Sequence, residues 1–171
     1  MTKRTNHRRH IDYMKRMTHM YINATVPLNY EFHPHNTDFP FTVNGKEYRS
    51  LTHYIQSCKY GDTSWAELVR TSETVKEARY LGKTRLYPLD SNWASNYEQI
   101  IRDGIKARFD QHPFLKNRLM KCYASQICVQ YAHKEYSDRH TPYEQNIIGR
   151  LMLDVLSEFR QTRTRTQRVG T

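Results

Sequence analysis

A β-hairpin signal followed at once by a capped helix decides the fold of this chain, and the stretch reads FPFTVNGKEYRSLTHYIQSCKY from residue 39 to residue 60. The dipeptide Asn44-Gly45 is favoured in two-residue β-turns, so residues 39–48 predict a short hairpin. Ser50 can then cap a helix whose apolar residues recur at i, i+3, i+4 and i+7, the spacing of one buried stripe. That stripe consists of Leu51, Tyr54, Ile55 and Cys58. The polar side of the same helix carries Thr52, Gln56 and Lys59.

Further helices are predicted on the C-terminal side of this stretch. Residues 64–67 have the form of a capping box, in which Ser64 caps the start of a helix, and Ser72 predicts the start of another that ends at Gly82. A long amphipathic helix follows Asn92 and stops before Pro113, which suits the first turn of the next helix. The apolar face of the long helix is Trp93, Tyr97, Ile100, Ile101, Ile105 and Phe109. The face of the last helix is Ile148, Leu151, Met152, Val155 and Phe159.

Two shorter elements complete the predicted fold. Residues 14–24 could form a helix, and the alternation within residues 127–131 predicts a short strand. The 171 residues suit one domain with a sizeable core, and the sequence has no internal repeat. We therefore predict a mainly α fold, a single helical domain with a short N-terminal β-hairpin.

The composition of the chain limits the cellular compartments in which we expect the protein. The sequence has no apolar run of the roughly 20 residues that cross a bilayer, and its N-terminus is polar where a signal peptide would be apolar. Three cysteines without CxxC spacing predict free thiols and argue against disulfides or a zinc site; they are Cys58, Cys122 and Cys128. We expect a cytoplasmic protein with no membrane partner, with mitochondria or the cytoplasm of a virus-infected host cell as alternatives.

The net charge of +10 lies almost wholly at the two ends of the chain. Residues 1–16 carry six basic residues against one acid, and residues 160–171 carry four arginines and no acid, which are Arg160, Arg163, Arg165 and Arg168. We accordingly divide the chain into a basic extension (1–25), a domain (26–160) and an Arg-rich tail (161–171). Such ends suit contact with the phosphates of RNA or DNA, although solvated ends that aid solubility are the alternative. An Arg-rich, acid-poor N-terminus is also compatible with a transit peptide.

Four stretches, taken together and in this order, resemble the NADAR (YbiA-like) family. They are FPFTVNGK (39–46), LTHYIQSCKY (51–60), Asn92-Trp93 followed by IKARFDQHP (105–113), and NIIGRLM (146–152). The resemblance implies an α-rich, orthogonal helical domain that binds ADP-ribose, NAD or a related ribosyl nucleotide. It also implies that the protein could hydrolyse an N-glycosidic bond, as several members of the family do.

The resemblance also assigns site residues, with departures. In the family, the helix after the hairpin presents Glu-His-Tyr and then Gln and Lys. This sequence keeps four of these positions, as His53, Tyr54, Gln56 and Lys59, but has Thr52 where Glu is usual. His133 and Tyr136 stand where a downstream loop of the family has an acid and Trp, and Pro34-His35-Asn36 stands in place of Ser-Asn-Phe before the hairpin.

These departures matter because breaking a ribosyl C–N bond develops positive charge that a carboxylate stabilises. Thr52 has neither charge nor basicity. Lys59 could still form a Schiff base with an opened ribose, although a phosphate-binding or simply exposed lysine is the alternative. A carboxylate from another segment could replace the missing Glu; the candidates are Glu31, Glu135 and Asp138. The catalytic candidates are therefore Lys59 and the altered position Thr52.

Ligand contacts are predicted at six further positions, each with a structural alternative, which for Gln56 is a surface position. They are His53, Tyr54, Gln56, Trp93, Asn146 and Gly149. Trp93 could stack on an adenine, although a Trp at core spacing usually packs; Asn146 and Gly149 could let the last helix approach a phosphate. The histidines lack the spacing of metal ligands, so no metal and no cofactor are expected.

Three functions of different classes stay open at this stage. The first is an N-glycosidase or ADP-ribosyl hydrolase that works through Lys59. The second is a module that binds the nucleotide without turnover. The third is a catalytically degenerate fold with a structural or nucleic-acid-associated role, in which the arginine tails bind RNA or DNA.

Overall fold

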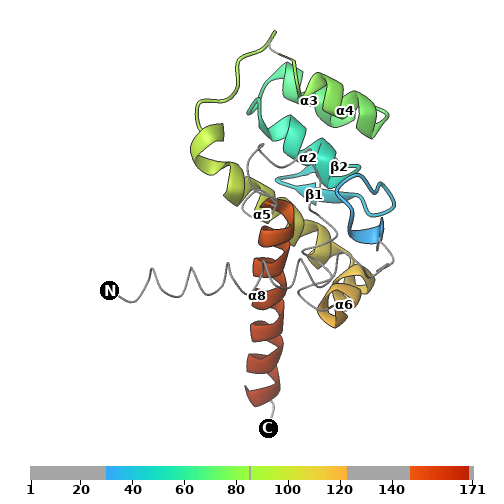
Figure 1. Cartoon of the computed structure of the whole chain (residues 1–171), viewed down its shortest axis with the longest axis vertical. Helices are drawn as coiled ribbons and strands as arrows, with labels where there is room; N and C mark the ends of the chain where they lie inside the picture. The colour runs from blue at the N-terminus through green and yellow to red at the C-terminus, as the bar shows by residue number, and fades with distance from the viewer. Residues whose placement is uncertain (1–29, 85, 123–146, 170–171) are drawn as a thin grey trace, which may run out of the picture.

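The structure, a computed structural model, describes residues 30–84, 86–122 and 147–169, and Figure 1 shows their arrangement. A short 3-10 helix, η1 (Tyr30–Phe32), precedes the antiparallel strands β1 (Phe41–Val43) and β2 (Lys46–Tyr48). The helices are α2 (Leu51–Cys58), α3 (Ser64–Thr71), α4 (Val75–Leu81), α5 (Trp93–Gln111), α6 (Pro113–Lys121) and α8 (Ile147–Val169). The predicted mainly α fold with a short hairpin is confirmed.

The hairpin forms where the Asn-Gly dipeptide predicts it. Asn44 and Gly45 adopt φ angles of 50° and 76°, which the turns that join tightly paired strands require. Phe41 pairs with Tyr48 across the strands, and both side chains are buried. The ring of Tyr48 meets the ring of Tyr54 edge-on, with 4.9 Å between centroids. The hairpin therefore presses one apolar face onto α2.

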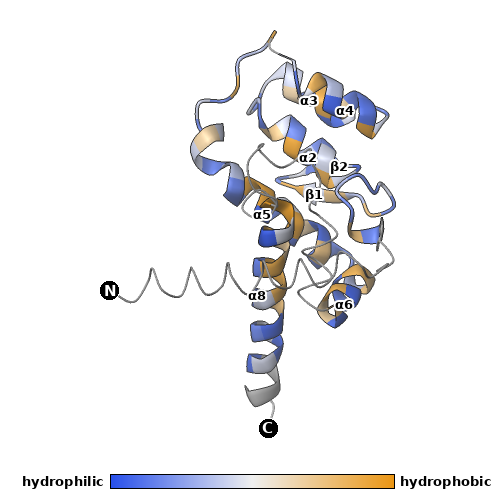
Figure 2. Ribbon diagram, viewed as in Figure 1, coloured by the Kyte–Doolittle hydropathy of each residue, from blue (hydrophilic) through white to orange (hydrophobic). Residues whose placement is uncertain are grey.

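The main core lies where α5 crosses α2 and α8, and Figure 2 shows apolar residues of α5 and α8 gathered at their crossing. All five residues predicted for the apolar face of the last helix are buried there. Gly104 allows α2 and α5 to approach closely, because a Cβ at that position would lie 2.4 Å from the Tyr54 ring. The periodicity of the sequence thus identified the faces through which both long helices pack against the core.

A smaller core joins α3 and α4 at the far end of α2, built from Tyr60, Ala66, Val69 and Ala78. The residues predicted to cap these two helices, Ser64 and Ser72, are wrong, because the observed caps lie one residue before Ser64 and two residues after Ser72. Thr63 caps α3 by accepting a hydrogen bond from Ala66 N (3.1 Å), and Thr74 caps α4. Ser72 instead donates to Val69 O (2.9 Å) and closes the end of α3. A cap must be the extended residue that immediately precedes the helix, and Thr63 and Thr74 hold that position.

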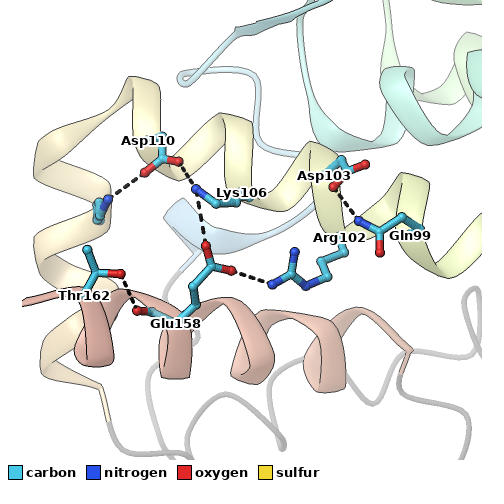
Figure 3. A network of polar contacts seen from close by, with 8 residues as sticks. Gln99, Arg102, Asp103, Lys106, Asp110, Glu158 and Thr162 are labelled. Atoms are coloured by element: carbon cyan, nitrogen blue, oxygen red, sulfur yellow. Dashed lines mark hydrogen bonds and ion pairs between the residues drawn. The ribbon is translucent and has the colours of Figure 1, made fainter. Parts of the chain in front are cut away.

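Ion pairs fix α8 against α5, as Figure 3 shows. Glu158 of α8 lies between Arg102 (2.5 Å) and Lys106 (3.6 Å) of α5. Arg160 donates to the carbonyl oxygens of Met120 (3.0 Å) and Cys122 (2.9 Å), which binds α8 to the end of α6. Beyond this point α8 continues to Val169, so the helix passes through the predicted tail boundary at residue 160.

Several predictions fall outside the described residues. They concern the basic extension (1–25), the helix at 14–24, the strand at 127–131, Cys128, His133, Glu135, Tyr136, Asp138 and Asn146. Cys58 and Cys122 are described, and both are free cysteines. Among the described helices, none combines the length and the apolar character needed to cross a membrane.

Candidate functional site

Helix α2 carries the candidate site, and its polar side is as buried as its apolar side. Each residue from Leu51 to Ser57 is buried, including Thr52 at 0% and Gln56 at 7% exposure. The apolar stripe was predicted to be buried, whereas a surface position was one alternative for Gln56, and that alternative is wrong. The polar groups on this side must therefore be hydrogen-bonded by other segments of the chain.

At the C-terminal end of α2, Lys59 is held in a polar clamp. Its Nζ donates to Gln56 Oε1 (2.6 Å) and to the carbonyl oxygen of Gly82 (3.1 Å) at the end of α4. Burial, and then the charge of Lys83, lowers the pKa of the Lys59 amine below its ordinary value. A lowered pKa increases the fraction of neutral amine, which is the form that attacks a carbonyl carbon. The simply exposed lysine of the alternative interpretation is thus ruled out.

Gly82 completes this clamp because it has no side chain. A Cβ on Gly82 would lie 2.2 Å from Gln56 Oε1 and 2.7 Å from Gln56 Cβ, well inside van der Waals contact. The backbone of α4 therefore lies directly on the Gln56 side chain. The sequence marked Gly82 only as the end of a helix, and its contact with Gln56 depends on how α4 packs on α2.

At the N-terminal end of α2, Thr52 takes part in a second polar cluster. Its Oγ1 donates to the carbonyl oxygen of Pro34 (3.1 Å) and lies 2.7 Å from Nδ1 of His35. Its backbone N–H also donates to Pro34 O (3.0 Å). Thr52 thus binds the segment that enters the hairpin. Because α2 rises 1.5 Å per residue, this cluster and the Lys59 clamp are about 10 Å apart along one helix face.

A buried arginine that the sequence analysis did not single out shapes the segment before the hairpin. Arg108 of α5 is 1% exposed, and its guanidinium donates to the carbonyl oxygens of Glu31 (2.9 Å), Phe32 (3.3 Å) and His33 (3.2 Å). Arg108 lies in the stretch 105–113, which carries part of the family resemblance, but no charge pattern in the sequence marks this arginine as buried. Its partners are 75 to 77 residues away in the chain.

Asn36 also lies in this segment, and it is buried at 1% exposure. Its side chain bonds Asp38 twice, through Nδ2 to Oδ2 (3.0 Å) and from the backbone N of Asp38 to Oδ1 (2.8 Å). Hydrogen bonds with Arg108, Thr52 and Asp38 therefore hold residues 31–36, the segment that leads into the hairpin.

Three predicted ligand residues pack within the protein core. His53 is fully buried, and its Nδ1 lies 2.8 Å from Ser50 Oγ. Burial lowers the pKa of His53, whereas a hydrogen bond with the Ser72 backbone acts to raise it. Tyr54 lies among the aromatic rings of the hairpin, and burial raises its pKa. Trp93 is partly buried against the main core. Ligand contact at these residues stays a prediction.

The remaining predicted positions lie elsewhere. Glu31 pairs with Arg118 of α6, so its carboxylate is already engaged. Arg160 bonds the end of α6, whereas the side chains of Arg163 and Arg165 are exposed on α8. Gly149 is buried in α8, and Arg168 lies in the last turns of that helix. Within residues 30–84, 86–122 and 147–169, no group of three potential metal-ligating side chains occurs.

Comparison with known proteins identifies the family of this chain. N-glycosidase YbiA of Escherichia coli (strain K12) is 28% identical over 122 residues, which cover 71% of this chain and 76% of that protein. The N-glycosidase YbiA of Shigella boydii serotype 4 (strain Sb227) is similar to the same extent. The NMR structure of the E. coli protein YbiA superposes with a TM-score of 0.59 at 24% identity, over 78% of this chain and 80% of that one. The family model of the NADAR domain matches residues 13–160, and the chain therefore belongs to the NADAR domain family.

Proposed function

We propose that this chain binds an ADP-ribose-type nucleotide at the C-terminal end of α2 and cleaves an N-glycosidic bond to its ribose, with the partly exposed Lys59 as the nucleophile. The observation that carries the proposal is the clamp of Lys59 Nζ between Gln56 Oε1 and Gly82 O. Membership of the NADAR family and the similarity to N-glycosidases named YbiA support the reaction class.

The chemistry available to Lys59 accounts for each bond and proton. The neutral amine attacks C1′ of the ribose, and the C1′–N bond breaks with its electron pair on the leaving nitrogen; the nicotinamide of NAD leaves as a neutral molecule. Nζ then releases one proton, the C1′–O4′ bond breaks as the ring opens, O4′ takes up a proton, and a protonated imine forms between Nζ and C1′. Water hydrolyses the imine, releases the ribose aldehyde and regenerates the amine. This route uses a lysine as the covalent catalyst and so avoids the need for a carboxylate nucleophile at Thr52.

Two readouts with two ligands test the proposal. NAD contains an N-glycosidic bond, so release of nicotinamide measures turnover, and ADP-ribose has the free anomeric carbon that forms an imine. Borohydride reduction should link ADP-ribose to the protein at Lys59, as peptide mass spectrometry would show. Lys59→Ala should lose both turnover and the adduct. Lys76→Ala is a matched control, because Lys76 is an exposed lysine on α4.

The possible results separate the candidate functions. Turnover by Lys59→Ala at the wild-type rate would exclude the nucleophile role. A wild-type protein that ADP-ribose stabilises against heat but that releases no nicotinamide would be a binding module. Ligand at about 100 times its dissociation constant adds roughly 2.7 kcal/mol, a shift of several degrees.

A second candidate function, nucleic-acid association, is supported by the arginines of α8. Arg163 and Arg165 are exposed, and Arg163 lines a groove of about 530 Å³ together with Lys106 and Lys116. Deleting the tail from residue 160 would also remove the contacts of Arg160 with α6, so substitutions are the cleaner test. The double variant Arg163→Ala/Arg165→Ala should weaken RNA binding and flatten its salt dependence.

The matched control for this test is Arg150→Ala, at the other end of the same helix, where Arg150 pairs with Glu98. If the double variant and the control bind RNA equally at every salt concentration, the arginines of α8 have no role in binding.

A further inference from the structure

The segment that joins α4 to α5 is tied to Lys59 at both of its ends. Gly82, at the end of α4, accepts a hydrogen bond from Lys59 Nζ through its carbonyl oxygen (3.1 Å). Asp90, shortly before α5, donates its backbone N–H to the carbonyl oxygen of Lys59 (2.8 Å). The segment between Gly82 and Asp90 therefore starts and ends at the residue proposed as the nucleophile.

Tyr87 of this segment stacks on Trp65 of α3. The two rings are nearly parallel, with 15° between their planes and 4.5 Å between their centroids. In the main core, by contrast, the ring of Tyr54 meets the rings of Phe41 and Tyr48 edge-on. A parallel stack presents the flat face of its outer ring, which is the surface that a planar base contacts.

Hydrogen bonds place this stack beside the Lys59 clamp. Trp65 Nε1 donates to the carbonyl oxygen of Leu81 (3.3 Å), and Lys59 Nζ donates to that of the next residue, Gly82 (3.1 Å). The Cα atoms of consecutive residues are only about 3.8 Å apart. The hydroxyl of the buried Tyr60 also donates to Leu81 O (3.2 Å). The indole N–H and the lysine amine are thus bound to neighbouring carbonyls, so the stack borders the clamp.

The outer side of the stack is open to solvent. Trp65 is partly buried against the smaller core, whereas Tyr87 is 42% exposed. Among the described residues, Trp65 is the only ring that Tyr87 contacts. Leu86 and Leu89, on either side of Tyr87 in the chain, are exposed as well. Large apolar side chains that gather in one exposed place are typical of binding surfaces.

We infer that the Trp65–Tyr87 stack is the subsite for the leaving base, the planar aromatic base that the N-glycosidic bond joins to the ribose. The inference rests on the proposed function. An attacking amine must come within about 3.5 Å of C1′, and the leaving base is bonded directly to C1′. A ribose held for attack by Lys59 therefore brings its base to the surroundings of the clamp, where the outer face of Tyr87 stacks on it. The adenine of the ligand lies farther from this C1′, beyond the pyrophosphate.

The stack has a consequence for the choice of substrate. Every planar base has a π face, so the subsite accepts aromatic bases of different kinds. The base contacts the stack in the ground state as well as in the transition state. Loss of the Tyr87 ring should therefore raise KM for NAD more than it lowers kcat.

Binding to a protein that cannot turn over tests the subsite directly. In the Lys59→Ala background, Tyr87→Ala should weaken binding of NAD about 5-fold to 100-fold, the range expected for one base stacked on an aromatic side chain. Binding of ADP-ribose should not change, because ADP-ribose lacks the leaving base. Tyr87→Phe should bind NAD as tightly as the background protein, since Phe keeps the ring. Titration calorimetry measures both ligands. Tyr80→Ala is the matched control, because Tyr80 is a tyrosine of α4 that is 78% exposed.

Two results of this titration would overturn the inference. Equal weakening of NAD and ADP-ribose by Tyr87→Ala would place the adenine on the stack instead of the leaving base. Binding of NAD by Tyr87→Ala as tight as that of the Tyr80→Ala control would show that no base contacts the stack. Equal melting temperatures of the two variants would confirm that both are folded.

Failure of the proposed function gives a different pattern. A wild-type protein that releases no nicotinamide and binds neither NAD nor ADP-ribose would refute the proposed function and the subsite with it. A wild-type protein that turns over NAD, with an unchanged KM in Tyr87→Ala, would refute the subsite alone.

Discussion

Arg108→Met should destabilise the protein far more than Arg102→Met, although both arginines lie on α5. Arg108 is buried and bonds three backbone carbonyls, whereas Arg102 is partly exposed and pairs with Glu158. Removing the Arg108 guanidinium leaves three acceptors unsatisfied, each at a cost of about 1–3 kcal/mol, while burial of the cation is relieved. We expect a net loss of about 3 kcal/mol.

This loss can be measured as a change in melting temperature. For a protein of this length, 1 kcal/mol corresponds to about 2–4 °C, so Arg108→Met should melt about 6–12 °C lower than the wild type. Arg102→Met breaks an exposed ion pair worth at most about 1 kcal/mol and should shift by about 4 °C or less. Differential scanning calorimetry at one pH and salt concentration provides the comparison. Equal shifts for the two variants would refute the role of Arg108 as the support of residues 31–33.

Three further predictions concern close packing and burial. Gly104→Ala should destabilise the protein by about 1–3 kcal/mol in urea unfolding despite the better helix propensity of Ala, because its Cβ would meet the Tyr54 ring at 2.4 Å; higher stability would contradict this packing. Gly82→Ala should displace Gln56 and reduce formation of the Lys59 adduct with ADP-ribose, and a wild-type yield would show that the clamp is unnecessary. Since burial lowers the pKa of His53, the unfolded state binds its proton more readily, so the free energy of unfolding should fall as pH falls below about 6.5. That fall should be smaller in His53→Asn, and an unchanged slope would argue against the shift.

Local signals in the sequence were enough for most of the elements. The Asn-Gly turn, the periodic apolar faces and Pro113 predicted the hairpin, the two long helices and the break between α5 and α6. The errors at Ser64 and Ser72 are small and have a common cause. Threonine and serine occur together at both helix starts, and only the backbone conformation decides which of them is the cap.

The candidate site was less predictable, because its contacts join segments that lie far apart in the chain. The resemblance pointed to Lys59 and Thr52, but it could not show that Gly82 and Gln56 clamp the lysine or that His35 bonds the threonine. Arg108 carried no signal of its function at all. A sequence pattern reports which side of a helix is apolar, and it does not report which polar partners will cover the other side.

The sequence therefore determined the turns and the apolar faces, since these depend on φ preferences and on side-chain spacing within a few residues. Only the tertiary structure decided that α2 is buried on every side. A polar side chain can be buried only where a distant segment satisfies its hydrogen bonds, and the partners of Thr52, Lys59 and Arg108 lie 17, 23 and 75 residues or more away. Packing, rather than local preference, brought the groups of the candidate site together.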